Sequence, residues 1–295
     1  MADYVLTTCS TADRPRAFFE KRKIPFLCYH FEMDGVTYAD DLGLSIPIDE
    51  FYRRVAAGAM PVTSQINATE YAAFWEPFLQ DGKDIFHTTL SSGITGTINS
   101  ANAAAAILRE KYPERRIEVF DSLAASAGFG LFVELLADKR DEGASMDELL
   151  AYADRIRLHV HHWFFSTDLT SYWRGGRISK AKGIIGNALN ICPLMNVNNE
   201  GKLIPRRNVR TKRKVIEEQV KEMEQHAENG LKYSGKVRIS NSGCLEDAKK
   251  VKALVESKFP NIDGEAEISD IGTVIGAHTG PGTVALFFVG DLRTP

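Results

Sequence analysis

One histidine near the C-terminus stands in a segment without bulky neighbours. His278 lies in residues 275–282, together with three glycines and one proline. Glycine and proline favour turns and remove side-chain bulk, so we expect a loop in which the imidazole is open to a small anionic group. The alternative is a turn residue that binds nothing.

A short segment of serine and glycine also fits anion binding. Ser91, Ser92 and Gly93 follow an apolar run at 85–90 and precede an alanine-rich run at 97–111. A loop between a strand and a helix N-terminus binds carboxylate or phosphate, because free backbone N–H groups and the helix dipole both favour an anion there. No GK[ST] sequence follows, so nucleoside triphosphate binding is not predicted. A well-capped helix start explains the pattern equally well.

Thr63 belongs to a third segment of small polar residues. Ser64 and Gln65 follow it, and the three lie between predicted helices at 48–58 and 69–79. Such side chains commonly cap the helix that follows. They can also supply donors to a ligand, so both interpretations stay open at this point.

Two segments carry arginines that could contact a phosphate or a partner protein. Arg177 follows Gly175 and Gly176, a pattern typical of a helix C-cap but also of an arginine presented to a phosphate. Arg210 lies in residues 206–214, where six of nine residues are basic. A solvated helix entry is the commoner meaning of such a run, and docking of an acidic partner comes next.

The elements that position these residues alternate between short apolar runs and helical patterns. In the first half this alternation predicts parallel βα units with helices on both faces of a sheet. Ligands of such sheets gather at the carboxyl ends of the strands. The predicted strands are residues 4–7, 26–31, 85–90 and 117–120, and the predicted helices are 48–58, 69–79, 97–111 and 124–142.

The second half predicts a mixed α/β layer domain. After a break around 142–145 and a helix at 146–157, a hairpin at 194–205 turns at 198–201, and a charged helix covers 212–229. The remaining predictions are strands at 236–240, 267–270 and 283–289 and a helix at 245–258. We therefore expect an α/β protein of two domains, residues 1–160 and 161–295, with a ligand cleft between them.

The composition indicates a globular protein and argues against a nucleic-acid binder. The chain has 295 residues, of which 44% are hydrophobic and 25% charged, and its formal net charge is −3. The four cysteines form no CxxC pair, which favours free thiols in a reducing compartment. No signal-peptide pattern is seen, and no apolar run approaches the roughly 20 residues of a membrane span. We expect a soluble cytoplasmic protein.

No pattern of a catalytic or metal centre stands out. His159, His161 and His162 are close together, but no carboxylate or cysteine stands at zinc spacing, and the aromatic residues that follow suggest a buried strand. No GxSxG nucleophile segment is present. We expect no metal, no cofactor and no autonomous enzymatic activity. The alternative is an enzyme that acts on a small phosphorylated or carboxylated metabolite at residues 91–93.

Taken in order, these segments resemble the DegV family of bacterial fatty-acid-binding proteins. The order and spacing agree over essentially the whole chain. Residues 10–13 look like the family's DSTAD opening, and residues 175–194 look like its GGRI…LNIKPI segment. The other matching segments are 63–65, 91–93 and 275–282.

The resemblance implies two α/β domains with a long-chain fatty acid bound between them. It also implies the binding subunit of a fatty-acid kinase in phospholipid synthesis, which holds the acid while a separate kinase subunit phosphorylates the carboxylate to an acyl-phosphate. Arg177 and Arg210 would lie near the mouth and bear on phosphoryl transfer or kinase docking. No nucleic-acid partner is implied, and a transient contact with a membrane surface is compatible with this role. By motif matching, the carboxylate would contact Thr63, Ser91, Ser92, Gly93 and His278.

Two cysteines depart from the family pattern. Cys9 stands where the family usually has the aspartate of the opening motif, and Cys192 stands where it usually has the lysine of NIKPI. We expect both to change the electrostatics of the mouth and neither to contact the carboxylate. The apolar candidates for the lining of a tunnel are Phe164, Phe165, Ile184, Ile185, Leu189 and Ile191.

Overall fold

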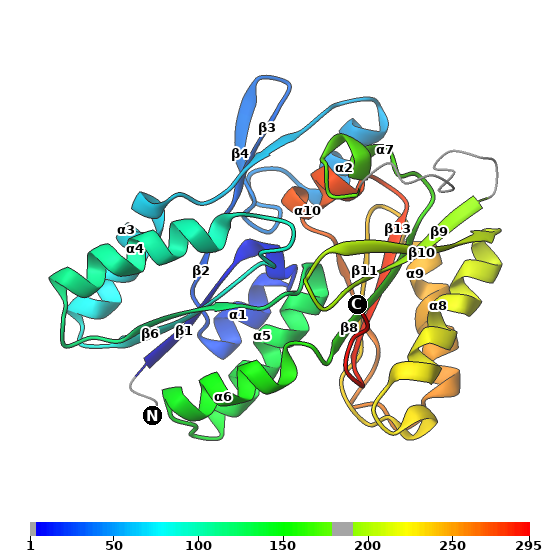
Figure 1. The fold of residues 1–295 in the computed structure, drawn as a ribbon. Helices are drawn as coiled ribbons and strands as arrows, with labels where there is room; N and C mark the ends of the chain where they lie inside the picture. The colour runs from blue at the N-terminus through cyan, green and yellow to red at the C-terminus, as the bar shows by residue number, and fades with distance from the viewer. Residues whose placement is uncertain (1–3, 179–190) are drawn as a thin grey trace.

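A parallel sheet organises the first half of the chain. The computed structural model describes residues 4–178 and 191–295. Within them, the first sheet has the strand order β2-β1-β6-β7, and each neighbouring pair is parallel. Figure 1 shows α3 and α4 on one side of this sheet and α5 and α6 on the other, so the predicted arrangement is confirmed. Its strands are β1 (Tyr4–Cys9), β2 (Phe26–Leu27), β6 (Asp84–Thr89) and β7 (Ile117–Asp121). The helices are α1 (Arg16–Arg22), α3 (Ala68–Gln80), α4 (Thr97–Lys111), α5 (Ser126–Asp141) and α6 (Met146–Ile156).

A small antiparallel sheet was not predicted. The single strand expected at 26–31 is wrong, because the chain leaves β2 and starts a new sheet in which β3 pairs with β4 and β5. Asp34 and Gly35 make the tight turn between β3 and β4, both with positive φ (53° and 77°). The elements are β3 (His30–Met33), β4 (Val36–Ala39), α2 (Ile48–Ala56) and β5 (Val62–Ser64).

The second half is built on a mixed sheet with the strand order β10-β9-β8-β13-β11-β12. β11 and β12 are parallel, and the other neighbours are antiparallel. Its strands are β8 (Val160–Ser166), β9 (Ile191–Val197), β10 (Leu203–Arg210), β11 (Arg238–Asn241), β12 (Glu267–Asp270) and β13 (Thr283–Val289). The helical elements of this half are α7 (Thr170–Arg174), α8 (Lys212–His226), η2 (Gly230–Lys232), α9 (Leu245–Lys258) and α10 (Thr273–Thr279). A further short helix, η1 (Ser10–Ala12), follows β1 in the first half.

The predicted hairpin is present, with two corrections to its surroundings. The Gly201 N–H donates to the Asn198 carbonyl at 3.0 Å in the turn between β9 and β10. The basic run at 206–214 is only in part a helix entry, because β10 continues to Arg210 opposite Ile191 and α8 begins at Lys212. The charged helix ends at His226, three residues before the predicted end.

The segment around His278 is a helix and not the predicted loop. α10 begins at Thr273, whose N–H and hydroxyl both donate to the Asp40 carboxylate from the first half of the chain. Gly280 ends the helix with φ of 65°, a conformation that glycine adopts without cost. His278 therefore projects from the last turn of α10.

α5 joins the two large sheets. It packs on the first half through η1 and on the second through β8, β11 and β13. Gly128 of α5 permits the close approach, since a Cβ there would lie 2.4 Å from His162 Nε2 and 2.5 Å from the Phe287 ring. The larger core cluster consequently includes residues of both sheets. The division into domains at 160/161 stays a prediction.

Two buried carboxyl groups lie beside α5 and α10 and give a pH-dependent prediction. Asp13 accepts a hydrogen bond from the Ser126 hydroxyl at 2.6 Å, and burial, with the charge of Asp40 second, raises the pKa of Asp13 well above its usual value. The unfolded pKa is about 3.9, so the stability that Asp13 contributes is complete below that pH and is lost as pH rises towards the folded pKa. Asp13→Asn removes this loss.

We therefore expect Asp13→Asn to gain stability relative to the wild type as the pH rises from about 4.5 to about 7.5, because burial disfavours the charged form of the Asp13 carboxyl group and asparagine has no charged form. Asparagine tolerates the positive φ of 48° at this position. Urea midpoints of both proteins at the two pH values measure the effect. An unchanged difference between the midpoints would show that Asp13 does not hold a raised pKa.

Candidate functional site

A cavity of about 550 Å³ lies between the first sheet, the small sheet and the second large sheet. Part of the cavity wall is formed by the paired strands β13 and β8. In this pair Thr283 lies opposite Ser166, Ala285 opposite Phe164, and Phe287 opposite His162. From Thr283 to Phe287 the cavity wall extends about 13 Å at about 3.3 Å per residue. The apolar lining residues are Leu90, Ile94, Ala125, Phe164, Val197, Leu203, Ile271, Val274, Ile275, Ala285 and Phe287.

Polar lining residues gather around His278. The Thr63 hydroxyl and His278 Nε2 are 2.8 Å apart and form a hydrogen bond between β5 and α10. Ser64, Gln65 and Gly96 also line the cavity and are exposed, so this polar side is where the cavity opens to solvent. The structure therefore brings Thr63 and His278 together, although 215 positions separate them in the chain.

The His278 imidazole is neutral at physiological pH. Burial, and the charge of Arg177 second, lower the pKa of His278 to about 4. Its Nδ1 and the Thr279 hydroxyl are buried without a hydrogen-bond partner among the described residues. Buried polar atoms are nearly always paired, so these two atoms mark a place for a polar ligand group or water.

Arg177 is the cation of this site. It lines the cavity, and its Nη1 donates to the Gly175 carbonyl at 2.6 Å. Burial lowers the pKa of Arg177, and no carboxylate of the described residues forms an ion pair with it. A half-buried guanidinium without a counter-ion favours an anionic ligand.

Ser91, Ser92 and Gly93 do not line the cavity. The Ser91 hydroxyl donates to the Gly201 carbonyl at 2.8 Å, so it ties this loop to the β9–β10 turn. The Ser92 N–H donates to the Asp121 carboxylate at 3.1 Å. A carboxylate of the chain itself therefore takes the donor that we expected an anionic ligand to use. Their role in binding stays a prediction.

Sequence reasoning missed Thr95 and Gly96, which bring the start of α4 to the cavity. Both line it, and Gly96 is the N-cap of this 15-residue helix. The positive end of the helix dipole thus faces the polar side of the cavity. The loop that contains Ser91 and Ser92 continues through Thr95 and Gly96. Position before the helix could therefore have identified Thr95 as a candidate ligand residue as well.

The other candidates have varied outcomes. Arg210 is exposed at the end of β10 and is not a lining residue. Phe165 and Cys192 belong to the second core cluster, and Cys9 is fully buried against Tyr71 and His87, so neither cysteine is a lining residue; their effect on the electrostatics of the mouth stays a prediction. Ile191 is not a lining residue, whereas Phe164 is. Ile184, Ile185 and Leu189 lie outside the described residues.

Gly175 gives a prediction about the position of the imidazole. A Cβ at Gly175 would lie 2.3 Å from His278 Nδ1, so alanine at this position must displace the ring. We expect Gly175→Ala to weaken binding of an anionic ligand about fivefold, which corresponds to about 1 kcal/mol. Calorimetric titration of the ligand into both proteins measures this.

The control is the neighbouring glycine. Gly176 has φ of 69°, and a Cβ at this position would have no atom within 4 Å, so Gly176→Ala strains the backbone without contacting His278. It should lower the unfolding midpoint and leave ligand affinity unchanged. Equal ligand affinities in the two variants would contradict the proposed contact.

No helix among the described residues combines the length and the apolar character that a membrane span requires.

The sequence and the fold of this chain are similar to those of known proteins. The family model for "Uncharacterised protein, DegV family" matches residues 4–291. A DegV domain-containing protein of Clostridium perfringens is 33% identical over 295 residues, covering 100% of each chain. The structure is similar to a DegV family protein from Thermus thermophilus described as binding fatty acid, with TM-score 0.85 and 27% identity over 97% of this chain and 99% of that one.

Two further structures extend the similarity. DegV of Bacillus subtilis, described as a fatty acid binding protein, has TM-score 0.83 and 26% identity over 98% of this chain and 99% of that one. The Streptococcus pneumoniae fatty acid kinase B3 protein, loaded with linoleic acid, shares the fold with TM-score 0.83 at 20% identity, over 98% of this chain and 99% of that one.

Proposed function

Because the chain belongs to the DegV family, we propose that it binds a long-chain fatty acid in the cavity between its sheets. The observation that carries the proposal is the lining of that cavity, which is mainly apolar, with Phe164, Ala285 and Phe287 on β8 and β13, and has hydroxyls, a neutral imidazole and one arginine on its polar side. Such a cavity matches a molecule with a long hydrocarbon tail and an anionic head.

The tail supplies most of the binding free energy in this proposal. Burial of a methylene gives about 0.8 kcal/mol, so about 14 methylenes give an upper bound near 11 kcal/mol. Lost translational and rotational freedom reduces the net value. The polar groups then fix which end of the acid lies at the opening.

The head group would be held by residues from three elements. We propose that His278 Nδ1–H of α10 donates to the carboxylate while the Thr63 hydroxyl of β5 donates to His278 Nε2 and fixes the ring, that the start of α4 at Thr95 faces the carboxylate, and that Arg177 balances its charge. Ser91, Ser92 and Gly93 would support this site by fixing the loop before α4 against the β9–β10 turn.

We further propose that a separate kinase subunit phosphorylates the bound acid. One carboxylate oxygen would attack the terminal phosphoryl group of a nucleoside triphosphate on that subunit, giving an acyl-phosphate and a nucleoside diphosphate. The open polar side of the cavity supports this, because the carboxylate would lie where a partner can reach it. Arg210 would contribute to docking from the end of β10. The name of the pneumococcal relative, a fatty acid kinase B3 protein, also supports a kinase partner.

Native mass spectrometry of the protein purified from bacteria tests the binding proposal. We expect a mass that exceeds the chain by one long-chain fatty acid, and release of that acid on denaturation. A ligand-free protein that also fails to bind oleate and palmitate in a fluorescence displacement titration would contradict it.

A further inference from the structure

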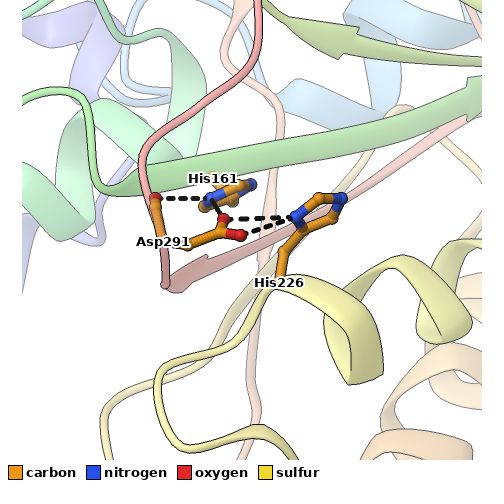
Figure 2. A group of neighbouring side chains, drawn as sticks. All are labelled: His161, His226 and Asp291. Atoms are coloured by element: carbon orange, nitrogen blue, oxygen red, sulfur yellow. Dashed lines mark hydrogen bonds and ion pairs between the residues drawn. The ribbon is translucent and has the colours of Figure 1, made fainter.

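Three side chains that are distant in sequence meet at the end of the second sheet away from the polar opening. His161 lies on β8, His226 is the last residue of α8, and Asp291 follows β13. Figure 2 shows both imidazoles directed at the Asp291 carboxylate. Their metal-binding atoms lie within 4.8 Å of one another. The fatty-acid proposal does not use any of the three.

The distances inside this cluster suit a small cation. His161 Nε2 is 3.1 Å from Asp291 Oδ1 and 2.9 Å from the Asp291 carbonyl oxygen. His226 Nδ1 is 3.1 Å from the same Oδ1 and 3.2 Å from Oδ2. A tetrahedral zinc with bonds of about 2.0–2.1 Å separates its ligand atoms by about 3.3 Å, so small side-chain movements would place an ion among these atoms.

The surroundings hold the two imidazoles in place. The His161 ring is nearly parallel to Phe288, with centroids 5.1 Å apart, and the His226 ring is nearly parallel to Trp163, with centroids 5.9 Å apart.

Glu222 supplies the feature that separates this cluster from an ordinary hydrogen-bonded group. Its Oε2 lies 3.6 Å from His226 Nε2, on the side of the ring opposite to Asp291. A carboxylate behind a histidine is the arrangement that orients metal-ligating imidazoles. When a metal takes Nδ1, the proton of the neutral ring moves to Nε2, where Glu222 can accept its hydrogen bond.

We propose that His161, His226 and Asp291 form a binding site for Zn²⁺ or a similar divalent transition metal. The donors are two imidazole nitrogens and a carboxylate, a set that zinc accepts with a water molecule as the fourth ligand. Asp291 is exposed, so the ion can enter from solvent. The metal would join the segment after β13 to α8 and β8. Sequence spacing around His161 could not show this, because the other two ligands come from 65 and 130 positions further along the chain.

Titration of Zn²⁺ into the full chain after chelator treatment tests the site. We expect saturation at one equivalent and a higher unfolding temperature with Zn²⁺ than without it. His226→Gln and Asp291→Asn should each weaken Zn²⁺ binding at least tenfold. Glu222→Gln, which removes the carboxylate behind His226 together with its ion pair to Arg207, should weaken it about tenfold.

His30→Gln is the matched control. His30 is also a half-buried histidine near a carboxylate, 3.6 Å from Glu70 in the first half of the chain, and it is not part of the cluster. This variant should bind Zn²⁺ like the wild type. Wild-type protein that does not saturate near one equivalent would overturn the proposal. Wild-type affinity in His226→Gln and Asp291→Asn would also overturn it, since the ion would then bind elsewhere.

Discussion

Replacing His278 with alanine should reduce phosphorylation of the bound fatty acid by about 100-fold while lowering oleate affinity by less than about tenfold. A preorganised donor at a reacting oxygen contributes about 10²–10³ in rate when it is removed. The same hydrogen bond is a small part of an affinity that the tail dominates. Initial rates of acyl-phosphate formation with the cognate kinase subunit, set against calorimetric affinities for oleate, separate the two effects.

Thr63 provides the controls for this experiment. Thr63→Val removes the hydroxyl that bonds to His278 Nε2 and should reproduce the rate loss, whereas Thr63→Ser keeps the hydroxyl and should restore most of the rate. Equal losses of rate and affinity in His278→Ala would mean that the imidazole helps to hold the ligand as a whole and does not orient its carboxylate.

Filling the middle of the cavity should discriminate among fatty acids by length. Ala285 lines the cavity opposite Phe164, so Ala285→Phe would occupy space that we assign to the tail. Displacement of about four methylenes costs about 3 kcal/mol, and we expect palmitate affinity to fall by about 100-fold. Octanoate, whose shorter tail extends less far into the cavity, should lose much less affinity than palmitate.

Ala285→Ser is the control, because it changes the same residue but adds little volume to the side chain. It should bind palmitate within a few-fold of the wild type and unfold at a similar temperature. If Ala285→Phe binds both acids as the wild type does, the tail lies elsewhere and the proposed path along β13 is wrong. Unfolding temperatures of all three proteins show whether the larger side chain has damaged the fold.

Much of the architecture could be predicted from local patterns. The parallel strands around 85–90 and 117–120 have apolar runs followed by clear helical patterns, and the structure has β6 and β7 there. α10 could not be predicted in the same way. It is only seven residues long and has Gly276 in its interior, so intrinsic propensity opposes it. Its stability comes instead from Asp40, a partner more than 230 positions away.

The candidate site was only half predictable for a similar reason. Thr63 and His278 were assigned to the carboxylate through the resemblance, and the structure brings their side chains together, while their contact with a carboxylate stays a prediction. Ser91 was assigned to the site and Thr95 was missed, because both residue types stand before a helix and only the tertiary fold decides which one lines the cavity. The β9–β10 turn takes Ser91 and leaves Thr95 to the cavity.

The continuity of the larger core cluster across both sheets bears on how long the protein survives in a cell. Leu90, Phe164, Val197 and Phe287 belong to that cluster and also enclose the cavity of about 550 Å³, several times the roughly 150 Å³ of an engineered cavity that binds benzene. A ligand at about 100 times its Kd adds about 2.7 kcal/mol to the free energy of unfolding. Chains that acquire no fatty acid would open more often and be degraded first by cellular proteases. The abundance of the protein would then follow the supply of its ligand, without any change in gene expression.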